Sequence, residues 1–337
     1  MRAALLAVLL GVGCGGAVAD GTSSSNPPVA PSPPPTAAPP PTSPPTSPAL
    51  TIDEPNARGR SLAVDETSVF VASEAGGVAR FPALLDAKGT TLASGYFGTL
   101  ALDGASVYAV RDNRTLVRVP KAGGPETVLA VLDAGDTEVV RVAAGGVYFL
   151  SVTTAGLEHP ILHCTLGRVA KEGGASTLLM TYDGCGDLVV DDHAVYATRD
   201  RELLRIPVDG SAPSILLTLT GNDAWAPLSL AQDDLRIWIA SYGSRIFSVA
   251  KAGGAVEQRA TTAGLPSSLT VAGDDLYWLE RVSDLSGPPR ADLMTAPKGG
   301  GPARKLLDAV AGVQAVAANN DAVYCAGQGP LHRVARH

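Results

Sequence analysis

The stretch that decides the fold begins at Leu100-Ala101-Leu102-Asp103 and continues through Val107-Tyr108, Leu116-Val117-Arg118-Val119, Lys121-Ala122-Gly123-Gly124 and Thr127-Val128-Leu129. It contains four short apolar segments, separated by an Asp turn, a polar loop and a Gly-Gly turn. Segments of this length between turn residues are typical of β-strands. No sustained helical spacing of apolar residues occurs from residue 50 onward. The unit therefore predicts a four-stranded antiparallel sheet.

The same unit recurs along the rest of the chain, with a period of about 42 residues. Its aromatic position occurs seven times, at Phe70, Tyr108, Tyr148, Tyr196, Trp238, Tyr277 and Tyr324. The strands are apolar on both faces, which indicates that each sheet is packed between two others. We therefore predict an all-β, seven-bladed β-propeller of four-stranded blades, with six or eight blades as the alternatives.

The last copy of the unit has no fourth strand before the end of the sequence. The segment Ala49-Leu50-Thr51-Ile52 precedes the first copy and matches a fourth strand. Pairing it into the last blade would remove the exposed edges of an open ring. We expect this segment to close the propeller.

The recurring unit also resembles the YWTD repeat of low-density-lipoprotein-receptor-type propellers, most closely in Leu276-Tyr277-Trp278. It is similar as well to the units of bacterial lyase and lactonase propellers. The resemblance covers about residues 50–337. It implies an architecture rather than an activity.

The N-terminus has the features of an export signal. Residues 1–13 contain Arg2 and then an apolar run that is too short to cross a bilayer. Gly11-Val12-Gly13-Cys14 resembles the lipobox of bacterial lipoproteins, which implies a lipidated Cys14. An alternative cleavage site, Ala17-Val18-Ala19, would release a soluble protein.

A linker is expected between this signal and the propeller. Residues 14–48 are rich in Pro, Ser and Thr, a composition typical of a disordered, extended spacer. The expected organisation is a signal peptide (1–13), a lipid-anchored linker (14–48) and the propeller (49–337). The protein is expected at the bacterial outer membrane, facing the periplasm or the cell surface.

Composition and motifs narrow the function. With 26 Lys+Arg against 33 Asp+Glu, nucleic-acid binding is disfavoured because it needs a basic face. No nucleophile elbow, zinc-protease motif, phosphate loop or dinucleotide fingerprint occurs. The sequence favours a monomeric, non-catalytic binding propeller of the cell envelope, without a cofactor, whose partner is a protein, peptide or glycan.

The alternative is a secreted, lactonase-like hydrolase or lyase. Such an enzyme would need carboxylate and amide groups at the pore and a divalent metal. Asp183, Asp187, Asn222 and Asp223 are the candidates.

Residues that recur in every copy occupy equivalent positions in seven blades, spread around the ring. They cannot all belong to one site, so we expect them to stabilise the fold. An Arg recurs in the third strand at Arg80, Arg118, Arg168, Arg205 and Arg333. We expect it to pair with carboxylates at blade junctions or to extend outward. The Asp of the first turn (Asp65, Asp103, Asp191 and Asp274) is expected to hydrogen-bond the turn backbone.

Residues that differ between copies are the candidates for binding. They gather where the loops between second and third strands meet the connections between blades, and aromatic and Arg side chains dominate recognition surfaces. The candidates are Arg111, Asp112, Arg114, Tyr182, Asp183, Arg199, Arg201, Asn222, Asp223, Trp225, Tyr242 and Glu280. Arg111 and Arg199 occupy the same register, at the end of the second strand.

The cysteines predict a disulfide. Cys164 and Cys185 are 21 residues apart in a protein expected to be exported, where disulfides form. A zinc site that adds His159 and His163 is the alternative, but Cys164 points away from both histidines on an extended strand. Cys325 is expected to be an inert, buried thiol.

Overall fold

The computed structural model describes residues 49–73, 76–132, 135–155, 161–220, 229–282 and 290–336. The chain divides into two units, Met1–Pro44 and Pro45–His337, and the described residues all belong to the second. The predicted signal peptide, Cys14 and the linker lie outside the described residues, as do His159, Asn222, Asp223 and Trp225.

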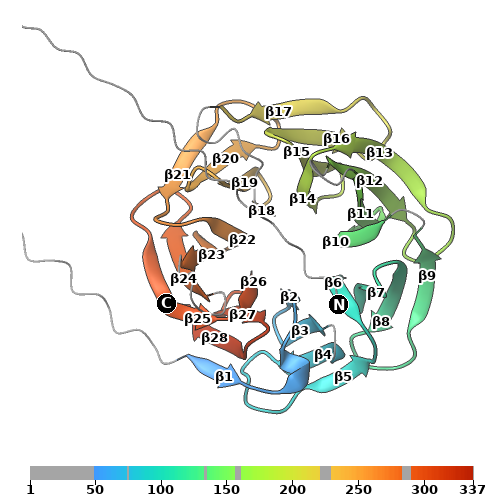
Figure 1. Ribbon diagram of the computed structural model, residues 1–337, viewed down its shortest axis with the longest axis vertical. Coiled ribbons are helices and arrows are strands. Elements are labelled where there is room, and N and C mark those ends of the chain that lie inside the picture. The colour runs from blue at the N-terminus through green and yellow to red at the C-terminus, as the bar shows by residue number, and fades with distance from the viewer. Residues whose placement is uncertain are drawn as a thin grey trace, which may run out of the picture. The chain divides into compact units, whose positions relative to one another are not determined.

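The described strands form seven four-stranded antiparallel sheets that are arranged in a ring (Figure 1). This confirms the seven-bladed propeller and excludes six or eight blades. Three blades come first in the chain. Blade 1 contains β2 (Ser61–Val64), β3 (Ser68–Ser73), β4 (Gly77–Pro82) and β5 (Thr90–Ala93). Blade 2 contains β6 (Phe97–Leu102), β7 (Ser106–Arg111), β8 (Thr115–Pro120) and β9 (Thr127–Val131). Blade 3 contains β10 (Asp136–Ala143), β11 (Gly146–Ala155), β12 (Ile161–Val169) and β13 (Thr177–Asp183).

The next three blades repeat this order. Blade 4 contains β14 (Cys185–Val190), β15 (Ala194–Arg199), β16 (Glu202–Pro207) and β17 (Ser214–Thr218). Blade 5 contains β18 (Ser229–Gln232), β19 (Arg236–Ser241), β20 (Arg245–Ala250) and β21 (Glu257–Thr261). Blade 6 contains β22 (Pro266–Ala272), β23 (Asp275–Val282), β24 (Arg290–Pro297) and β25 (Arg304–Ala311).

Blade 7 is built from both ends of the described chain. Its strands are β26 (Val313–Ala318), β27 (Ala322–Gly327), β28 (Leu331–Ala335) and β1 (Leu50–Ile52). β1 pairs antiparallel with β28, with Thr51 opposite His332, and the Thr51 hydroxyl lies 3.2 Å from the His332 ring. The predicted closure by the N-terminal segment is confirmed.

The core lies between neighbouring blades. The seven recurring aromatic side chains are all buried, each at most 2% exposed. One core cluster, for example, joins Phe70 of blade 1 to Val107 and Ala109 of blade 2. This packing on both sides explains why the strands carry apolar residues on both faces.

The order of strands gives the ring two different faces. Each blade is an antiparallel meander, so the turns between strands one and two and between strands three and four lie at the same end. We call this end the lysine face. The turns between strands two and three and the connections between blades lie at the other end, which we call the loop face. Within the described part of the chain, no helix has the length and apolarity needed to span a membrane.

Candidate functional site

The lysine face is held together by a repeated ion pair between neighbouring blades. The Asp of one blade's first turn binds the Lys that follows the third strand of the next blade. The pairs are Asp65–Lys121 (2.8 Å), Asp103–Lys171 (3.3 Å), Asp191–Lys251 (2.9 Å) and Asp233–Lys298 (3.2 Å). Lys121 and Lys251 also lie over the rings of Phe70 and Tyr196 in the preceding blade. Since the same contact recurs around the ring, this face builds the scaffold.

These turn aspartates also accept hydrogen bonds from their own turns. Asp65 accepts from the amides of Thr67 and Ser68 at 3.0 and 2.9 Å. Burial alone would raise the pKa of Asp65, but the hydrogen bonds from Lys121 and Thr67 outweigh it and lower the pKa. The role predicted for Asp65, Asp103 and Asp191 is therefore confirmed.

Three blades depart from the Asp turn. In blade 3, Ala144 and Gly145 stand between β10 and β11, so the turn has no Asp. In blade 6, Gly273 turns the chain with φ +52°, and Asp274 contributes its carbonyl to the amide of Lys298. In blade 7, Asn319 replaces the Asp and accepts from the amide of Ala322. Asp233 of blade 5 was not among the predicted turn aspartates, but its carboxylate accepts a hydrogen bond from the amide of Arg236.

Three of the five recurring third-strand arginines contact the neighbouring blade, but their acceptors are carbonyls, so they neither pair with carboxylates at the junctions nor simply extend outward, the two alternatives expected. Arg80 donates to the carbonyl of Lys121 at 2.9 Å, and Arg118 donates to that of Lys171 at 3.1 Å. Arg333 donates to Ala83 across the closed ring. At the junctions of Arg80 and Arg118, the carboxylates of Asp65 and Asp103 are already bound by Lys121 and Lys171.

A second repeated contact joins the innermost strands of neighbouring blades. A hydroxyl at the start of one strand accepts a hydrogen bond from a backbone amide of the next blade. The pairs are Ser61 with Leu100, Ser229 with Leu269, and Ser268 with Val316. We call this ring of contacts the collar.

Asp187 takes the serine's place in blade 4. Its Oδ2 accepts from the amide of Leu230 at 2.9 Å, and its Oδ1 accepts from Arg141 of blade 3 at 3.1 Å. This carboxylate therefore joins three blades.

Of the residues suggested for an acidic pore site, the two that the structure describes, Asp183 and Asp187, do not come together. The carboxylate of Asp183 lies at the end of β13, beside the ring of His163 on β12 at 2.5 Å. β12 and β13 are the two outer strands of blade 3, whereas Asp187 lies on an innermost strand. Across the described ranges, no three His, Cys, Asp or Glu side chains cluster as metal ligands would.

The predicted disulfide between Cys164 and Cys185 is present, with the two Cα atoms 6.0 Å apart. It joins β12 of blade 3 to β14 of blade 4. Both sulfurs are used in this bond, so the zinc alternative lacks two of its four ligands. Cys325 is a free, buried thiol, as expected, and burial raises its pKa to about 12.

Two of the binding candidates are buried instead of lying on the loop face. Tyr182 packs in the core cluster around the disulfide, where burial raises the pKa of its phenol. Glu280 is 7% exposed. Its Oε1 accepts from the amides of Ala263 and Gly264 at 2.9 and 2.7 Å, and thereby holds the connection into blade 6.

The arginines of blades 2 and 4 have the same setting on the loop face. Arg111 and Arg199 each end a second strand, and each is followed by an Asp with positive φ, +53° at Asp112 and +47° at Asp200. The Asp112 amide donates to Tyr96 and the Asp200 amide to Gly184, in the connections that precede β6 and β14. The Arg199 guanidinium binds Glu202. The Arg111 guanidinium binds Glu126 and also lies 3.8 Å from Asp112.

The turns that follow these residues are also tied to the connections between blades. The carbonyl of Arg114 accepts from the amide of Leu132, and that of Arg201 accepts from Leu219, both at 2.8 Å. The side chains of both arginines are exposed. Tyr242 lies half-buried in the equivalent turn of blade 5. The backbone of the loop face is thus a rigid support for exposed side chains.

The two faces differ in where lysine occurs: the lysine face carries lysines beside arginines such as Arg236 and Arg304, whereas the loop face carries arginines alone. All six lysines lie in or directly after the turns between third and fourth strands, on the lysine face: Lys88, Lys121, Lys171, Lys251, Lys298 and Lys305. The cations at the loop end are all arginines: Arg58, Arg60, Arg111, Arg114, Arg199, Arg201, Arg245, Arg281 and Arg290. Arginine presents a planar set of donors that suits carboxylates, whereas lysine acts as a point charge. The loop face therefore has the chemistry of a recognition surface.

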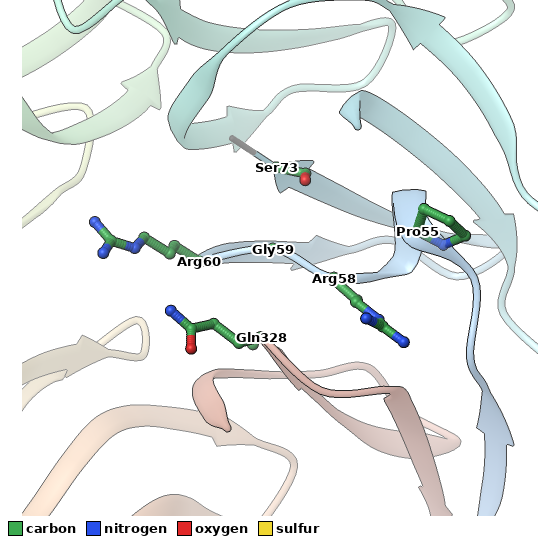
Figure 2. A pocket seen from close by; sticks show the side chains of 7 residues that line it. Pro55, Arg58, Gly59, Arg60, Ser73 and Gln328 are labelled. Atoms are coloured by element: carbon green, nitrogen blue, oxygen red, sulfur yellow. The ribbon is translucent and has the colours of Figure 1, made fainter. Parts of the chain in front are cut away.

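A pocket of about 290 Å³ opens on the loop face between blades 7 and 1 (Figure 2). It is lined by Pro55, Arg58, Gly59, Arg60, Ser73, Gly327 and Gln328. The connection from β1 to β2 borders it and contains a 3-10 helix, η1 (Pro55–Ala57). Two other connections are far shorter, since Gly184 and Gly312 are each the single residue between two blades. The closure of the ring therefore creates this pocket.

The pocket was hard to predict from the sequence. Residues 55–60 and 327–328 come from opposite ends of the propeller sequence, and neither segment carries a motif. The one feature of the sequence that pointed to this region was the presence of two arginines close together, Arg58 and Arg60.

Solved structures with the same architecture have low sequence identity. No protein-family model matches the sequence, and neither does any curated protein. The WD40 β-propeller domain of Doa1 is 13% identical with a TM-score of 0.63, covering 86% of this chain and 96% of that chain. YCF48 bound to D1 peptide is 11% identical with a TM-score of 0.62 and the same two coverages. A chain of the mitotic checkpoint complex is 12% identical with a TM-score of 0.64, covering 87% and 95%. These similarities show the propeller fold.

Proposed function

We propose that this protein is a non-catalytic binding propeller that recognises an acidic segment of a protein partner on its loop face. The observation that carries the proposal is that every lysine lies on the lysine face, whereas the cations at the loop-face end are all arginines. The lysine face uses its charges in contacts between blades, with Lys121, Lys171, Lys251 and Lys298 bound to aspartates. The loop face instead presents exposed arginines on a backbone held by hydrogen bonds.

Two further observations support binding rather than catalysis. Asp187 and Glu280 are committed to backbone amides of neighbouring segments, so neither carboxylate is placed for general acid or base work. Among the structural neighbours, YCF48 is described as bound to a D1 peptide.

The setting that we propose is the bacterial cell envelope. The signal peptide (1–13) would direct export, a lipid on Cys14 would attach the chain to the membrane, and the linker (14–48) would hold the YWTD-like propeller away from the surface. Partition of the protein between detergent and aqueous phases tests the anchor. Wild type is expected in the detergent phase and Cys14→Ser in the aqueous phase; equal partition would refute lipidation.

Selection from a displayed library of random ten-residue peptides tests the binding face. We expect the full mature chain to enrich peptides rich in Asp and Glu. Replacement of two exposed loop-face arginines in equivalent turns, Arg114→Gln and Arg201→Gln, should weaken binding of the selected peptides at least about tenfold, because hydrogen bonds between charged groups are lost.

A matched variant carries the same change of charge on the other face. Lys88 and Arg304 are exposed at the lysine-face end, and Lys88→Gln with Arg304→Gln should bind as wild type does. Equal losses in the two variants would show that net charge, and not the loop face, governs binding. No loss in the loop-face variant would refute the proposed face.

A further inference from the structure

At its lysine-face end, the junction between blades 3 and 4 lacks the ion pair that joins other blades. The turn between β10 and β11 has no Asp, and Val208 stands directly after the third strand of blade 4, where blade 2 has Lys121. The Tyr148 hydroxyl is buried at this junction without a hydrogen bond to a residue that the structure describes. A backbone amide, that of Ala144, donates to Asp192 of blade 4 at 2.8 Å. This end of the junction therefore depends mainly on apolar packing.

The other end of the same junction carries the disulfide. Cys164 lies near the loop-face end of β12, and Cys185 is the first residue of β14. Both side chains are buried in the apolar cluster that joins the two blades, at 2% and 8% exposed. Gly184 is the single residue between β13 and β14. The bond therefore fixes the end of the connection from blade 3 to blade 4.

This connection contacts the turn that carries the loop-face arginines of blade 4. Cys185 lies directly opposite Arg199 in the sheet. The Gly184 amide donates to the carbonyl of Leu162 on β12 at 2.9 Å, and the Gly184 carbonyl accepts from the amide of Asp200 at 2.6 Å. A continuous path of contacts thus runs from blade 3 through the connection to the turn after β15.

The turn fits closely against the connection. Gly184 has φ +72°, and a Cβ atom there would lie 1.8 Å from Oδ1 of Asp200. Arg201 follows Asp200 with its side chain exposed, and its carbonyl accepts from the amide of Leu219. Because the two backbone segments are in direct contact, the placement of the Arg201 guanidinium depends on the connection whose end the disulfide holds.

The equivalent turn of blade 2 is tied to the next blade by a side chain rather than by a covalent bond. The side-chain amide of Asn113 donates to Asp136 at the start of β10, at 3.3 Å. The turn of blade 4 is shorter and contains no Asn. Arg114 in blade 2 is therefore an internal reference for Arg201, because its turn lies outside the segment that the disulfide links.

From these contacts we infer that the Cys164–Cys185 disulfide is a positioning element of the loop face: by fixing the connection at Gly184, it holds the Arg201 guanidinium where it can bind a carboxylate of the peptide. This inference rests on the proposed function and adds to it a pair of residues that acts through Arg201 without touching the ligand. Loss of the bond should weaken peptide binding through Arg201 and leave the contribution of Arg114 unchanged.

Two variants interrupt the path of contacts at different points. Cys164→Ala with Cys185→Ala removes the disulfide, whereas Gly184→Ala keeps it and forces the connection away from Asp200. Gly210→Ala is the matched control. Gly210 lies in the lysine-face turn of the same blade with φ +84°, and an added Cβ would meet no atom within 4 Å. The control thus adds similar backbone strain without the clash.

Amide signals of the full-length protein, labelled with ²H and ¹⁵N, report the position of the turn in the absence of a ligand. Both test variants should shift the signals of Asp200 and Arg201 and leave those of Asp112 and Arg114 unchanged. Gly210→Ala should leave all four signals unchanged.

Binding of a ten-residue oligoglutamate and of the selected peptides then measures how much each arginine contributes. In the wild-type background, Arg201→Gln and Arg114→Gln should each weaken binding about threefold or more, because hydrogen bonds between charged groups are lost. In the disulfide-free and Gly184→Ala backgrounds, Arg201→Gln should weaken binding less than about 1.5-fold, whereas the effect of Arg114→Gln should stay at about threefold. A disulfide that only stabilises the fold would leave both contributions unchanged in the native protein.

Two results would overturn the inference: an effect of Arg201→Gln that is the same with and without the disulfide, or identical behaviour of Gly184→Ala and Gly210→Ala. The comparison of the two glycine variants decides the question by itself if the disulfide-free chain does not fold.

The outcome is separable from that of the proposed function. If Arg114 and Arg201 contribute equally to peptide binding in every background, the positioning role fails and the proposed function stands. If no acidic peptide binds while the signals of Asp200 and Arg201 shift in both test variants, the proposed function fails and the positioning of the turn by the disulfide stands.

Discussion

Replacing Asp187 tests whether this carboxylate is part of the scaffold or part of an enzyme site. Its side chain is 16% exposed and binds Arg141 of blade 3 and the amide of Leu230 of blade 5. A hydrogen bond to a charged group contributes roughly 1.5–3 kcal/mol. Asp187→Ala removes two such contacts between blades, so we expect it to lower the free energy of unfolding by about 3–5 kcal/mol.

Asp187→Ser is the informative partner of this variant. Ser61, Ser229 and Ser268 hold the equivalent backbone amides in other blades, so a serine at 187 should again accept from Leu230 and lose only the contact with Arg141. We expect Asp187→Ser to be more stable than Asp187→Ala by about 2 kcal/mol.

Urea unfolding measures both effects through the fluorescence of Trp238 and Trp278, which are buried. Asp183→Ala serves as the control. Its exposed carboxylate pairs with His163 at the surface, and such pairs contribute at most about 1 kcal/mol. If Asp187→Ala costs less than about 1 kcal/mol, or if serine and alanine are equally destabilising, the collar does not have the structural role assigned to it.

Three further predictions concern stability. Deletion of residues 1–52 removes β1 and exposes the edge of β28, so the truncated protein should be less stable and should self-associate, as sedimentation would reveal; a monomer of unchanged stability would contradict this. The pKa values of Asp65, Asp103, Asp191 and Asp233 are lowered in the folded protein. These carboxylates therefore contribute fully to the free energy of unfolding above the unfolded-state pKa of about 3.9. That contribution is lost as the pH falls through the lower folded-state pKa values. The urea midpoint should therefore decrease below about pH 4, and a midpoint that is constant from pH 5 to about pH 2 would count against the ion pairs. Reduction of the Cys164–Cys185 disulfide, which spans 21 residues, should cost about 3 kcal/mol in urea unfolding, and identical midpoints with and without dithiothreitol would argue against that contribution.

The repeat and its closure were predictable because both depend on local patterns. Each copy carries the aromatic position, the turn residues and the apolar strands, and a four-stranded meander is formed from neighbours in sequence. The disulfide was also predictable, since only a few cysteines occur and the spacing between Cys164 and Cys185 is short. The partners of the third-strand arginines were not, because the choice between a carboxylate and a carbonyl depends on which group the adjacent lysine already occupies.

The candidate site was predicted less completely. Arg111 and Arg199 were placed correctly in register, because the end of a strand is visible in the repeat. Glu280 has the same register but is buried, since the connection into blade 6 folds back so that the amides of Ala263 and Gly264 bind its carboxylate. Sequence position alone does not distinguish a surface side chain from one covered by a connecting segment.

The amino-acid sequence by itself determined that the chain forms a ring of seven like sheets and that the first strand completes the last sheet, because strand length, turn residues and burial on both faces are properties of each repeat. Only the tertiary structure decided which polar residues from distant parts of the sequence lie together. Arg60 and Gln328 are 268 positions apart in the sequence and line the same pocket because closure of the ring brings the first connection beside the last blade. Asp187, likewise, is occupied because the ring places an amide and a guanidinium from two other blades against it.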